Sequence, residues 1–289
     1  MKRLLYVFLL SSCLSSAALA WDSNGHQVIA QIAYDNLRPE VKAQVEILVP
    51  IVGQYYELND FVSAAPWADW LKGDNVHAYD EWHYIDQPVT QGTCNKCTLP
   101  LPSPASENVV WAIQQAIQVL STPSVGSYPQ EHVYEKSMFL LFLEHFVGDI
   151  HQPLHAVSLF SDTFPNGDQG GNLYTIKATI ANNLHSYWDQ GGGVFPESSM
   201  SETQLKVIAI KIEHDYPETT FGAKATDLNP INWSHESQQL AQNIVYKLPE
   251  NVVPNKVYTK IAQQTAEQQA ALAGYRLANL LNQMFEQQQ

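Results

Sequence analysis

One helix-forming segment of the chain is apolar on every side and still carries ionisable groups. Between residues 138 and 150, Met, Phe, Leu, Val and Ile cover all faces, while His145 and Asp149 stand one helical turn apart. A helix that is hydrophobic all round lies inside a folded protein. Because an unpaired buried carboxylate is very costly, Asp149 needs a positively charged partner there.

A metal ion fits this partner better than a basic side chain does. The basic residues nearest to the segment are Lys136 before Asp149 and Lys177 after it. Pro153 follows the helix and redirects the chain, so that His155 can face a second metal.

Other histidines and aspartates repeat the pattern. His185 and Asp189 have the same spacing of four residues, and Asp69 and His83 are further candidates. A single histidine is more often a core or surface residue than a ligand, but two such pairs together with His155 indicate metal binding. Imidazole and carboxylate without thiolate suit zinc in a catalytic site.

The remaining histidines beyond the N-terminal region lack such companions. We interpret His77, His132, His214 and His235 as structural or solvated residues. His151, between the helix and Pro153, is expected close to the ligands without being one.

Helical spacing of apolar residues dominates the chain. It predicts helices over residues 28–37, 39–48, 65–72, 107–120, 132–150, 202–215, 234–246 and 257–285. Only Leu173–Ile180 has a strand-like composition, which predicts at most a short β-hairpin. We therefore expect one mainly α-helical domain over residues 21–289.

Residues 1–20 have the pattern of a secretory signal peptide. Lys2 and Arg3 precede an apolar run, and Ala18-Leu19-Ala20 forms a cleavage site before Trp21. The serine-rich stretch after the run is too polar for a transmembrane anchor. The sequence predicts that this segment is removed and that the protein is secreted, to the periplasm or outside the cell, without a membrane anchor.

Removal of the signal segment leaves Cys94 and Cys97 as the two remaining thiols. In an oxidising compartment this pair most simply forms a local disulfide. A redox C-x-x-C motif belongs in a βαβ context that is missing here, and two thiols alone make a poor zinc site.

The charge of the chain limits its partners. Fifteen basic residues stand against 29 acidic ones, which gives a formal net charge of -14. This balance argues against a basic nucleic-acid-binding face and against a polybasic membrane patch. A partner that carries phosphate must be held by something other than an excess of Lys and Arg.

A series of motifs in a fixed order carries a resemblance to a known family. The motifs are Trp21 with His26, Trp67-Ala68-Asp69, His83 to Asp86, His145 to His155, Gly170-Gly171-Asn172, His185 with Asp189, Trp233 with Glu236 and Ser237, and Gly274 with Arg276. In this order the sequence resembles the S1/P1 nuclease family of trinuclear-zinc phosphoesterases over essentially the whole of residues 21–289.

The resemblance implies a helical fold around three zinc ions. The implied ligands are Asp69, His83, His145 and Asp149 for one ion, the α-amine and carbonyl of Trp21 with His26 and a shared Asp149 for another, and His155, His185 and Asp189 for the third. Zinc can displace the proton of an α-amine readily, because that group has a pKa near 8.

The resemblance also implies hydrolysis of single-stranded DNA and RNA to 5′-phosphate products, with 3′-nucleotidase activity. Asp69 would also orient the nucleophile, and Lys72, where many relatives have Arg, would stabilise charge on the phosphoryl oxygens. Asp86 and Asn172 would bind the base edge with Tyr84 as the aromatic face. A loop carboxylate and simple packing are the alternatives for Asp86 and Tyr84.

Two other functions remain open at the level of sequence. Related zinc phospholipases C also begin with a zinc-chelating Trp, but they have a longer gap to the next His and end the third motif with Glu. A secreted zinc-binding protein without catalysis is the other alternative. The sequence implies no protein partner, leaves use of the Asn232 glycosylation sequon open, and makes a monomer the default state.

Overall fold

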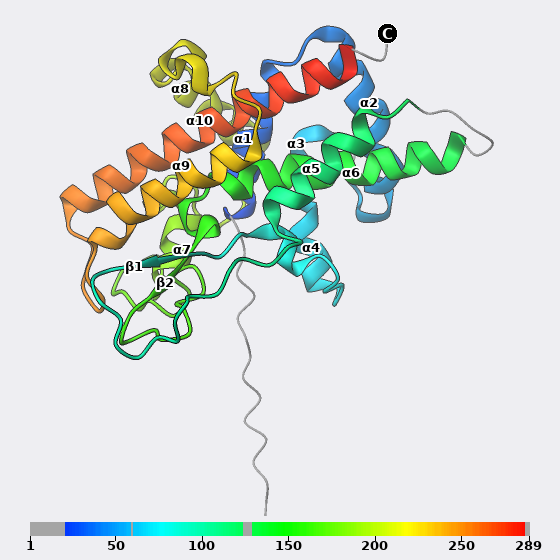
Figure 1. Ribbon diagram of the computed structural model, residues 1–289. Helices are drawn as coiled ribbons and strands as arrows, with labels where there is room; N and C mark the ends of the chain where they lie inside the picture. Colours follow the sequence, from blue (N-terminus) through cyan, green and yellow to red (C-terminus); the bar gives the residue numbers. More distant parts are fainter. Residues whose placement is uncertain (1–20, 59, 124–128, 287–289) are drawn as a thin grey trace, which may run out of the picture.

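The computed structural model describes residues 21–58, 60–123 and 129–286, which fold into an assembly of helices (Figure 1). The α-helices are α1 (Ser23–Asp35), α2 (Pro39–Gly53), α3 (Phe61–Ala64), α4 (Trp67–Gly73), α5 (Val109–Ser121), α6 (Pro129–His151), α7 (Leu184–Asp189), α8 (Glu202–Asp215), α9 (Pro230–Asn243) and α10 (Lys256–Glu286). Short 3-10 helices are η1 (Gln54–Tyr56), η2 (Asp80–His83), η3 (Pro153–Ala156), η4 (Gly191–Gly193), η5 (Glu218–Thr220), η6 (Gly222–Lys224) and η7 (Val245–Lys247). The mainly α-helical fold class is confirmed.

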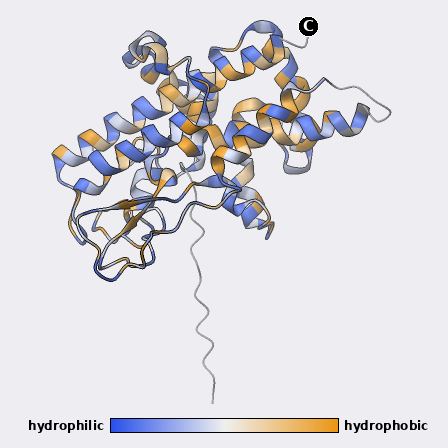
Figure 2. Ribbon diagram, in the orientation of Figure 1, coloured by the Kyte–Doolittle hydropathy of each residue, from blue (hydrophilic) through white to orange (hydrophobic). Residues whose placement is uncertain are grey.

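Helix α6 lies at the centre of the molecule. All of its residues from Leu140 to Ile150 are buried, as the apolar pattern predicts. Helices α2, α5, α9 and α10 pack against it, and α10 also packs along α1. Figure 2 shows hydrophobic residues on the inward faces of these helices and hydrophilic residues on their outer faces.

The buried apolar residues form two clusters that meet beside the end of α6. The larger cluster surrounds α6 and includes Ile150. The smaller cluster includes Leu154, Val157 and Trp188, together with residues of α9, η7 and the start of α10. The polar residues between Ile150 and Leu154 therefore lie where the two clusters meet.

The ends of the short helix α7 follow from its sequence. The side chain of Asn183 accepts the backbone N–H of Ser186 and caps the first turn. After Asp189, Gly191 takes a φ of 54°, where a side chain would be strained and its Cβ would meet Phe195 at 2.9 Å. The helix thus ends directly after Asp189.

The strand prediction is wrong in position and type. Strands β1 (Gln87–Thr90) and β2 (Val157–Phe160) form a two-stranded parallel sheet, with Gln87 opposite Val157. The segment Leu173–Ile180 is a loop with an isolated bridge from Thr175 to Asn183. All four residues of β2 are buried, so no polar alternation marks it, and its partner is distant in sequence.

A disulfide joins Cys94 and Cys97, as predicted. It lies in the loop after β1, where Asp162 accepts the backbone N–H groups of Asn95 and Lys96. The predicted signal peptide lies outside the described residues. Within residues 21–58, 60–123 and 129–286, each helix is either too short or too polar to cross a membrane.

Candidate metal centre

Three groups of histidine and aspartate side chains gather around the end of α6. The groups are His26, His145 and Asp149; Asp69, His83 and His145; and His155, His185 and Asp189. In each group the potential ligand atoms lie within 4.8 Å of one another. The residues come from α1, α4, η2, α6, η3 and α7. All of the predicted histidine and aspartate ligands therefore lie in these groups.

Asp149 stands between the first two groups. Its Oδ2 lies 3.0 Å from His83 Nδ1 and 3.4 Å from His145 Nε2. Its Oδ1 lies 3.5 Å from His26 Nε2 and 3.9 Å from His155 Nδ1. The two oxygens of one carboxylate thus face different histidines, which is the geometry that a bridging ligand requires.

His145 belongs to two groups, which the sequence alone does not show. Its ring stacks on His26 with centroids 3.9 Å apart, and its Nε2 lies 3.7 Å from Asp69 Oδ1. Gly148, one turn from His145 on α6, leaves room for this stack, because a Cβ there would come within 2.8 Å of His26 Nδ1.

Hydrogen bonds to backbone carbonyls determine which ring nitrogen carries the hydrogen in three of the histidines. Nδ1 of His145 donates to Ala65 O at 2.8 Å, Nδ1 of His155 to His83 O at 2.7 Å, and Nδ1 of His185 to Gly170 O at 2.7 Å. In a neutral imidazole the other nitrogen, Nε2, then carries a lone pair. Metal-binding histidines are oriented in this way.

Two of these lone pairs face each other. Nε2 of His155 lies 3.2 Å from Nε2 of His185, and the Nε2 of His185 lies 3.6 Å from Asp189 Oδ2. Three acceptors directed at one point repel one another unless a cation lies among them. The third group therefore fits a metal ion.

The first two groups also fit a metal ion. They contain buried polar atoms that have no hydrogen-bond partner among the described residues. These atoms include both ring nitrogens of His26, Nε2 of His83, Oδ1 of Asp69 and Oδ1 of Asp149. Buried polar atoms in folded proteins are almost always paired, so each such atom calls for an explanation. A bound metal accounts for Nε2 of His26 and for the oxygens of Asp69 and Asp149 among them.

The electrostatics of the groups also suit a metal. Burial lowers the pKa of His26, of His155 and of His83, the last to about 4, so these rings are neutral at pH 7. Burial alone would raise the pKa of Asp149, but the neighbouring His145, His26 and His83 bring it well below its usual range. Neutral imidazoles and an ionised carboxylate are the forms that bind zinc.

Trp21 lies beside two of the groups. It is fully buried, its Nε1 donates to Gly148 O at 2.9 Å, and its ring meets Phe195 edge-on. The next residue, Asp22, donates its N–H to Asp189 O at 3.1 Å. The backbone of Trp21 and Asp22 thus runs between α6 and the third group.

Two residues beside the candidate ligands were not predicted from the sequence. Asp22 has a buried Oδ2 without a hydrogen-bond partner among the described residues, and burial, with Glu197 and Asp69 nearby, raises its pKa to about 7. Gln152 donates a hydrogen bond to Asp189 Oδ1 at 2.7 Å. Gln152 could have been noticed in the sequence, because it is a polar residue between the apolar residues Ile150 and Leu154.

Lys72 lies on α4 three residues after Asp69. The Lys72 Nζ is 4.0 Å from Asp69 Oδ1, and both side chains are only 9% exposed. Burial alone would raise the pKa of Asp69, but His145 and His83 lower it below its usual range. An ionised carboxylate and an ammonium group therefore stand side by side at the metal groups.

The predicted base-binding residues flank the third group from two chain segments. Asp86 follows Ile85, whose N–H donates to His155 O at 2.7 Å. Burial and then the charge of Asp168 raise the pKa of Asp86 to about 6. Tyr84 is half-buried, and burial, followed by Asp86, raises its pKa to about 12.

Asn172 approaches from a glycine loop. Gly170, with a φ of 60°, has no space for a side chain, because a Cβ there would lie 2.6 Å from Leu154 O. The same Gly170 accepts the His185 ring N–H, and Asn172 Nδ2 donates back to Gln169 O at 2.9 Å. The loop that carries Asn172 is thus bonded directly to the third group.

The other histidines lie outside the three groups. His77 and His214 are exposed and lie 3.0 Å from Asp80 and Asp215, while His132 lies near Glu135. Nε2 of His151 lies 2.8 Å from Nη1 of Arg276, and its Nδ1 donates to Val147 O. Both ring nitrogens of His151 are thus bonded to residues outside the three groups. His235 lines a separate surface cavity.

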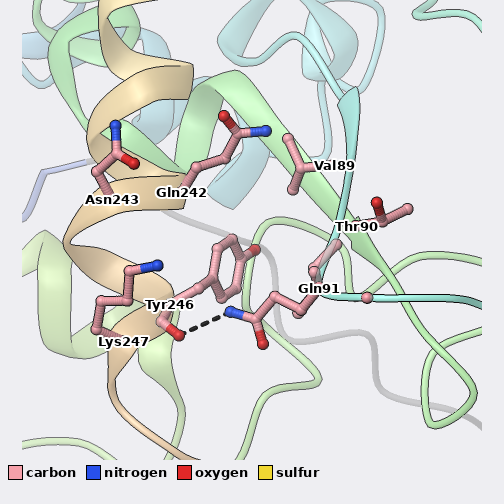
Figure 3. Close-up of a pocket in the computed structure, with 9 residues that line it drawn as sticks. Val89, Thr90, Gln91, Gln242, Asn243, Tyr246 and Lys247 are labelled. Carbon is pink, nitrogen blue, oxygen red and sulfur yellow. Dashed lines mark hydrogen bonds between the residues drawn. The ribbon is translucent and has the colours of Figure 1, made fainter.

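A further cavity of about 530 Å³ lies between β1 and the end of α9. Figure 3 shows its lining, where Gln91 donates to the backbone oxygen of Tyr246. None of the predicted site residues lines it. Tyr246 nevertheless connects it to the site, because its hydroxyl donates to Asp168 in the loop that leads to Asn172.

The sequence is similar to known nucleases along most of its length. The family model described as S1/P1 Nuclease matches residues 21–286. Endonuclease 4 of Arabidopsis thaliana is 29% identical over 294 residues, which cover 94% of this chain and 91% of that protein. Endonuclease 2 of the same plant is 34% identical over 176 residues, or 58% of this chain and 54% of that protein. Nuclease P1 of Penicillium citrinum is 25% identical over 285 residues, or 91% of this chain and 97% of that protein.

Proposed function

The chain belongs to the S1/P1 nuclease family, and on this premise we propose that it is a secreted, zinc-dependent phosphodiesterase. Its substrates are single-stranded DNA and RNA, its products carry 5′-phosphates, and it also removes the phosphate of 3′-nucleotides. The observation that carries the proposal is the convergence of three buried groups of imidazole and carboxylate ligands at one end of α6.

The donor atoms favour zinc. Asp69, His83, His145 and Asp149 would hold one ion; the amine and carbonyl of Trp21 with His26 and Asp149 a second; and His155, His185 and Asp189 a third. Zinc ions supply positive charge next to the scissile phosphate and lower the pKa of water. That charge explains how a chain with a net charge of -14 attracts a polyanion.

Asp69 and Lys72 are the catalytic residues in this proposal. Asp69, kept ionised, accepts a hydrogen bond from the attacking water and orients it. Lys72, 4.0 Å away, stabilises the negative charge that grows on the phosphoryl oxygens. Water adds to phosphorus, the bond to the 3′ oxygen breaks, and a 5′-phosphate and a 3′-hydroxyl result.

Single-strand preference comes from the residues beside the third group. Tyr84 offers an aromatic face, and Asp86 and Asn172 offer hydrogen-bonding groups to the base edge. A base must leave the stack of a duplex before it can reach such a slot. Stacking on an aromatic ring tolerates every base, which suits an enzyme that acts on both DNA and RNA.

Export is supported by two features. Residues 1–20 have the composition of a signal peptide, and the disulfide of Cys94 and Cys97 is typical of an oxidising compartment. Cleavage before Trp21 would free the α-amine that the second zinc requires.

Incubation of the purified protein with single-stranded DNA, RNA and phosphatidylcholine tests the function. We expect cleavage of both nucleic acids to 5′-phosphate ends, loss of this activity with EDTA, and no hydrolysis of the lipid. The variant His77→Ala, which changes an exposed histidine outside the groups, serves as the control and should cleave normally. Hydrolysis of the lipid alone would indicate a phospholipase C. Zinc binding without any hydrolysis would indicate a non-catalytic protein.

A further inference from the structure

Gln152 is a buried amide at the junction of α6 and η3. The residue has no exposed surface. Its Oε1 accepts the N–H of Leu154 at 2.6 Å, and its Nε2 donates to Asp189 Oδ1 at 2.7 Å. The Leu154 N–H is a donor, so the amide oxygen must face it. The amide NH₂ therefore points at the carboxylate of Asp189.

The backbone of Gln152 is bonded to two more of the proposed ligands. Its N–H donates to Asp149 O at 2.9 Å, and its carbonyl accepts the N–H of His155 at 3.0 Å. One residue is thus hydrogen-bonded to Asp149, His155 and Asp189. These three residues represent the bridging carboxylate and two of the three ligands of the third group.

We propose that Gln152 is a positioning residue that sets the orientation of the Asp189 carboxylate toward the third metal. The proposal rests on the proposed function, because it requires a metal at His155, His185 and Asp189. The hydrogen bond occupies Oδ1 of Asp189 and leaves Oδ2, which lies 3.6 Å from His185 Nε2, directed at the group.

The position of Asp189 explains why it needs this support. It is the last residue of α7, and three glycines with positive φ follow directly after Gln190. Without the amide donor, a buried carboxylate oxygen would lose its hydrogen bond and the group could rotate away from the metal. Loss of such an outer partner typically weakens metal binding 10–100-fold.

The test is zinc binding by Gln152→Met, which keeps the size of the side chain and removes both hydrogen bonds. Zinc content after dialysis against a chelator of known affinity is measured for the wild-type protein and the variant. We expect three zincs in the wild type, and in the variant one zinc that binds about 10–100-fold more weakly than it does in the wild type. A folded variant that keeps all three zincs at wild-type affinity would overturn the proposal.

Two comparisons separate positioning from a general structural effect. Gln31→Met is the matched control, because Gln31 is also buried and its amide donates to the carboxylate of Asp35, which lies outside the metal groups. It should keep three zincs of normal affinity. In an Asp189→Ala background, Gln152→Met should weaken zinc binding no further, since the two residues act as one unit. An equal loss in both backgrounds would contradict the proposal.

If Gln152→Met does not fold, Gln152→Glu takes its place, because an oxygen still accepts the N–H of Leu154. At pH 9 its second oxygen has no hydrogen to donate to Asp189, so the third zinc should again bind more weakly than in the wild type at the same pH. Equal affinity would overturn the proposal. A wild-type protein that binds no zinc would overturn the proposed function as well, whereas three zincs in the wild type and in a folded variant would overturn the role of Gln152 alone.

Discussion

At the scale of single residues, the candidate metal centre depends on which nitrogen of each histidine ring faces its group. His145, His155 and His185 each donate Nδ1–H to a backbone carbonyl, so each presents Nε2 to its group. The carbonyls belong to Ala65, His83 and Gly170, which lie on three separate segments. The sequence spacing identified these histidines, but their orientation depends on chain segments that meet only in the folded protein.

We expect the ionised carboxylate of Asp86, which we propose binds the base, to lower the free energy of unfolding. Its pKa rises from 3.8 to about 6 through burial and the charge of Asp168. The folded protein therefore holds this proton more tightly than the unfolded chain. The stability that protonated Asp86 contributes is fully present below pH 3.8. It is lost as the pH rises through about 6. At pH 8, Asp86→Asn should raise the free energy of unfolding by about 1–3 kcal/mol, while KM for single-stranded DNA increases.

Urea unfolding of both proteins at pH 4, 6 and 8 measures the effect, and the difference should shrink toward zero at pH 4. Asp162→Asn is the control, because the pKa of Asp162 is shifted in the opposite direction. The pKa of Asp162 is lowered, first by a hydrogen bond from Asn95, so this substitution should not stabilise the protein at pH 8. A wild-type protein as stable as Asp86→Asn at pH 8 would show that ionisation of Asp86 does not reduce stability.

At the scale of elements, the longer helices were predictable because each carries a local signal, whereas the short helices α3 and α7 were not predicted. The apolar pattern on α6 and the proline at the start of α2 mark helices without knowledge of the rest of the fold. The helix expected over residues 65–72 corresponds to α4, which begins at Trp67, directly after Pro66. The parallel pairing of β1 with β2 could not be predicted, since it joins segments about 70 residues apart and β2 is buried on both sides.

The loop that carries Asn172 gives a prediction at this scale. Asp168 is fully buried, and its carboxylate accepts the N–H of Leu159 and the hydroxyl of Tyr246, both at 2.8 Å. Tyr246→Phe removes one of these bonds, so we expect a loss of about 1.5–3 kcal/mol of stability. Because the loop then holds Asn172 less firmly, KM for single-stranded DNA should rise while zinc content stays at the wild-type value.

Steady-state kinetics and elemental analysis check this prediction. Tyr275→Phe is the matched control, because the buried Tyr275 donates its hydroxyl to Tyr216 O at 3.3 Å, away from the loop. It should lose stability without a change in KM. If both variants show the same kinetics, the contact between Tyr246 and Asp168 does not support the base-binding residues.

At the scale of the whole molecule, folding gathers candidate metal ligands from distant parts of an acidic chain. The ligands of the three groups come from segments that span residues 26 to 189, and α6 brings them to the boundary of two hydrophobic clusters. The motif order was enough to predict which histidines and aspartates gather in these groups. It could not show that His145 serves two groups, or that Gln152 links them, because these contacts depend on the three-dimensional packing of α6, α1 and α7.

The start of the mature chain gives the prediction that depends least on side chains. One extra Met before Trp21 turns the proposed amine ligand into an amide, which binds zinc very poorly at neutral pH. We expect a folded protein with fewer zincs and at least about tenfold lower activity, which corresponds to about 1.4 kcal/mol of lost transition-state stabilisation. Intact mass, zinc content and cleavage rate are compared with the processed protein. Equal zinc and equal rates, with the extra Met confirmed by mass, would exclude the amine as a ligand.

We propose that three zinc ions, held by the three groups, together carry out phosphodiester hydrolysis. The most direct test adds zinc back to metal-free processed protein and follows the cleavage rate of single-stranded DNA against the number of zincs bound per chain. We expect the rate to stay near background at one bound zinc and to reach its maximum only at three. Full activity with a single bound zinc would contradict the claim.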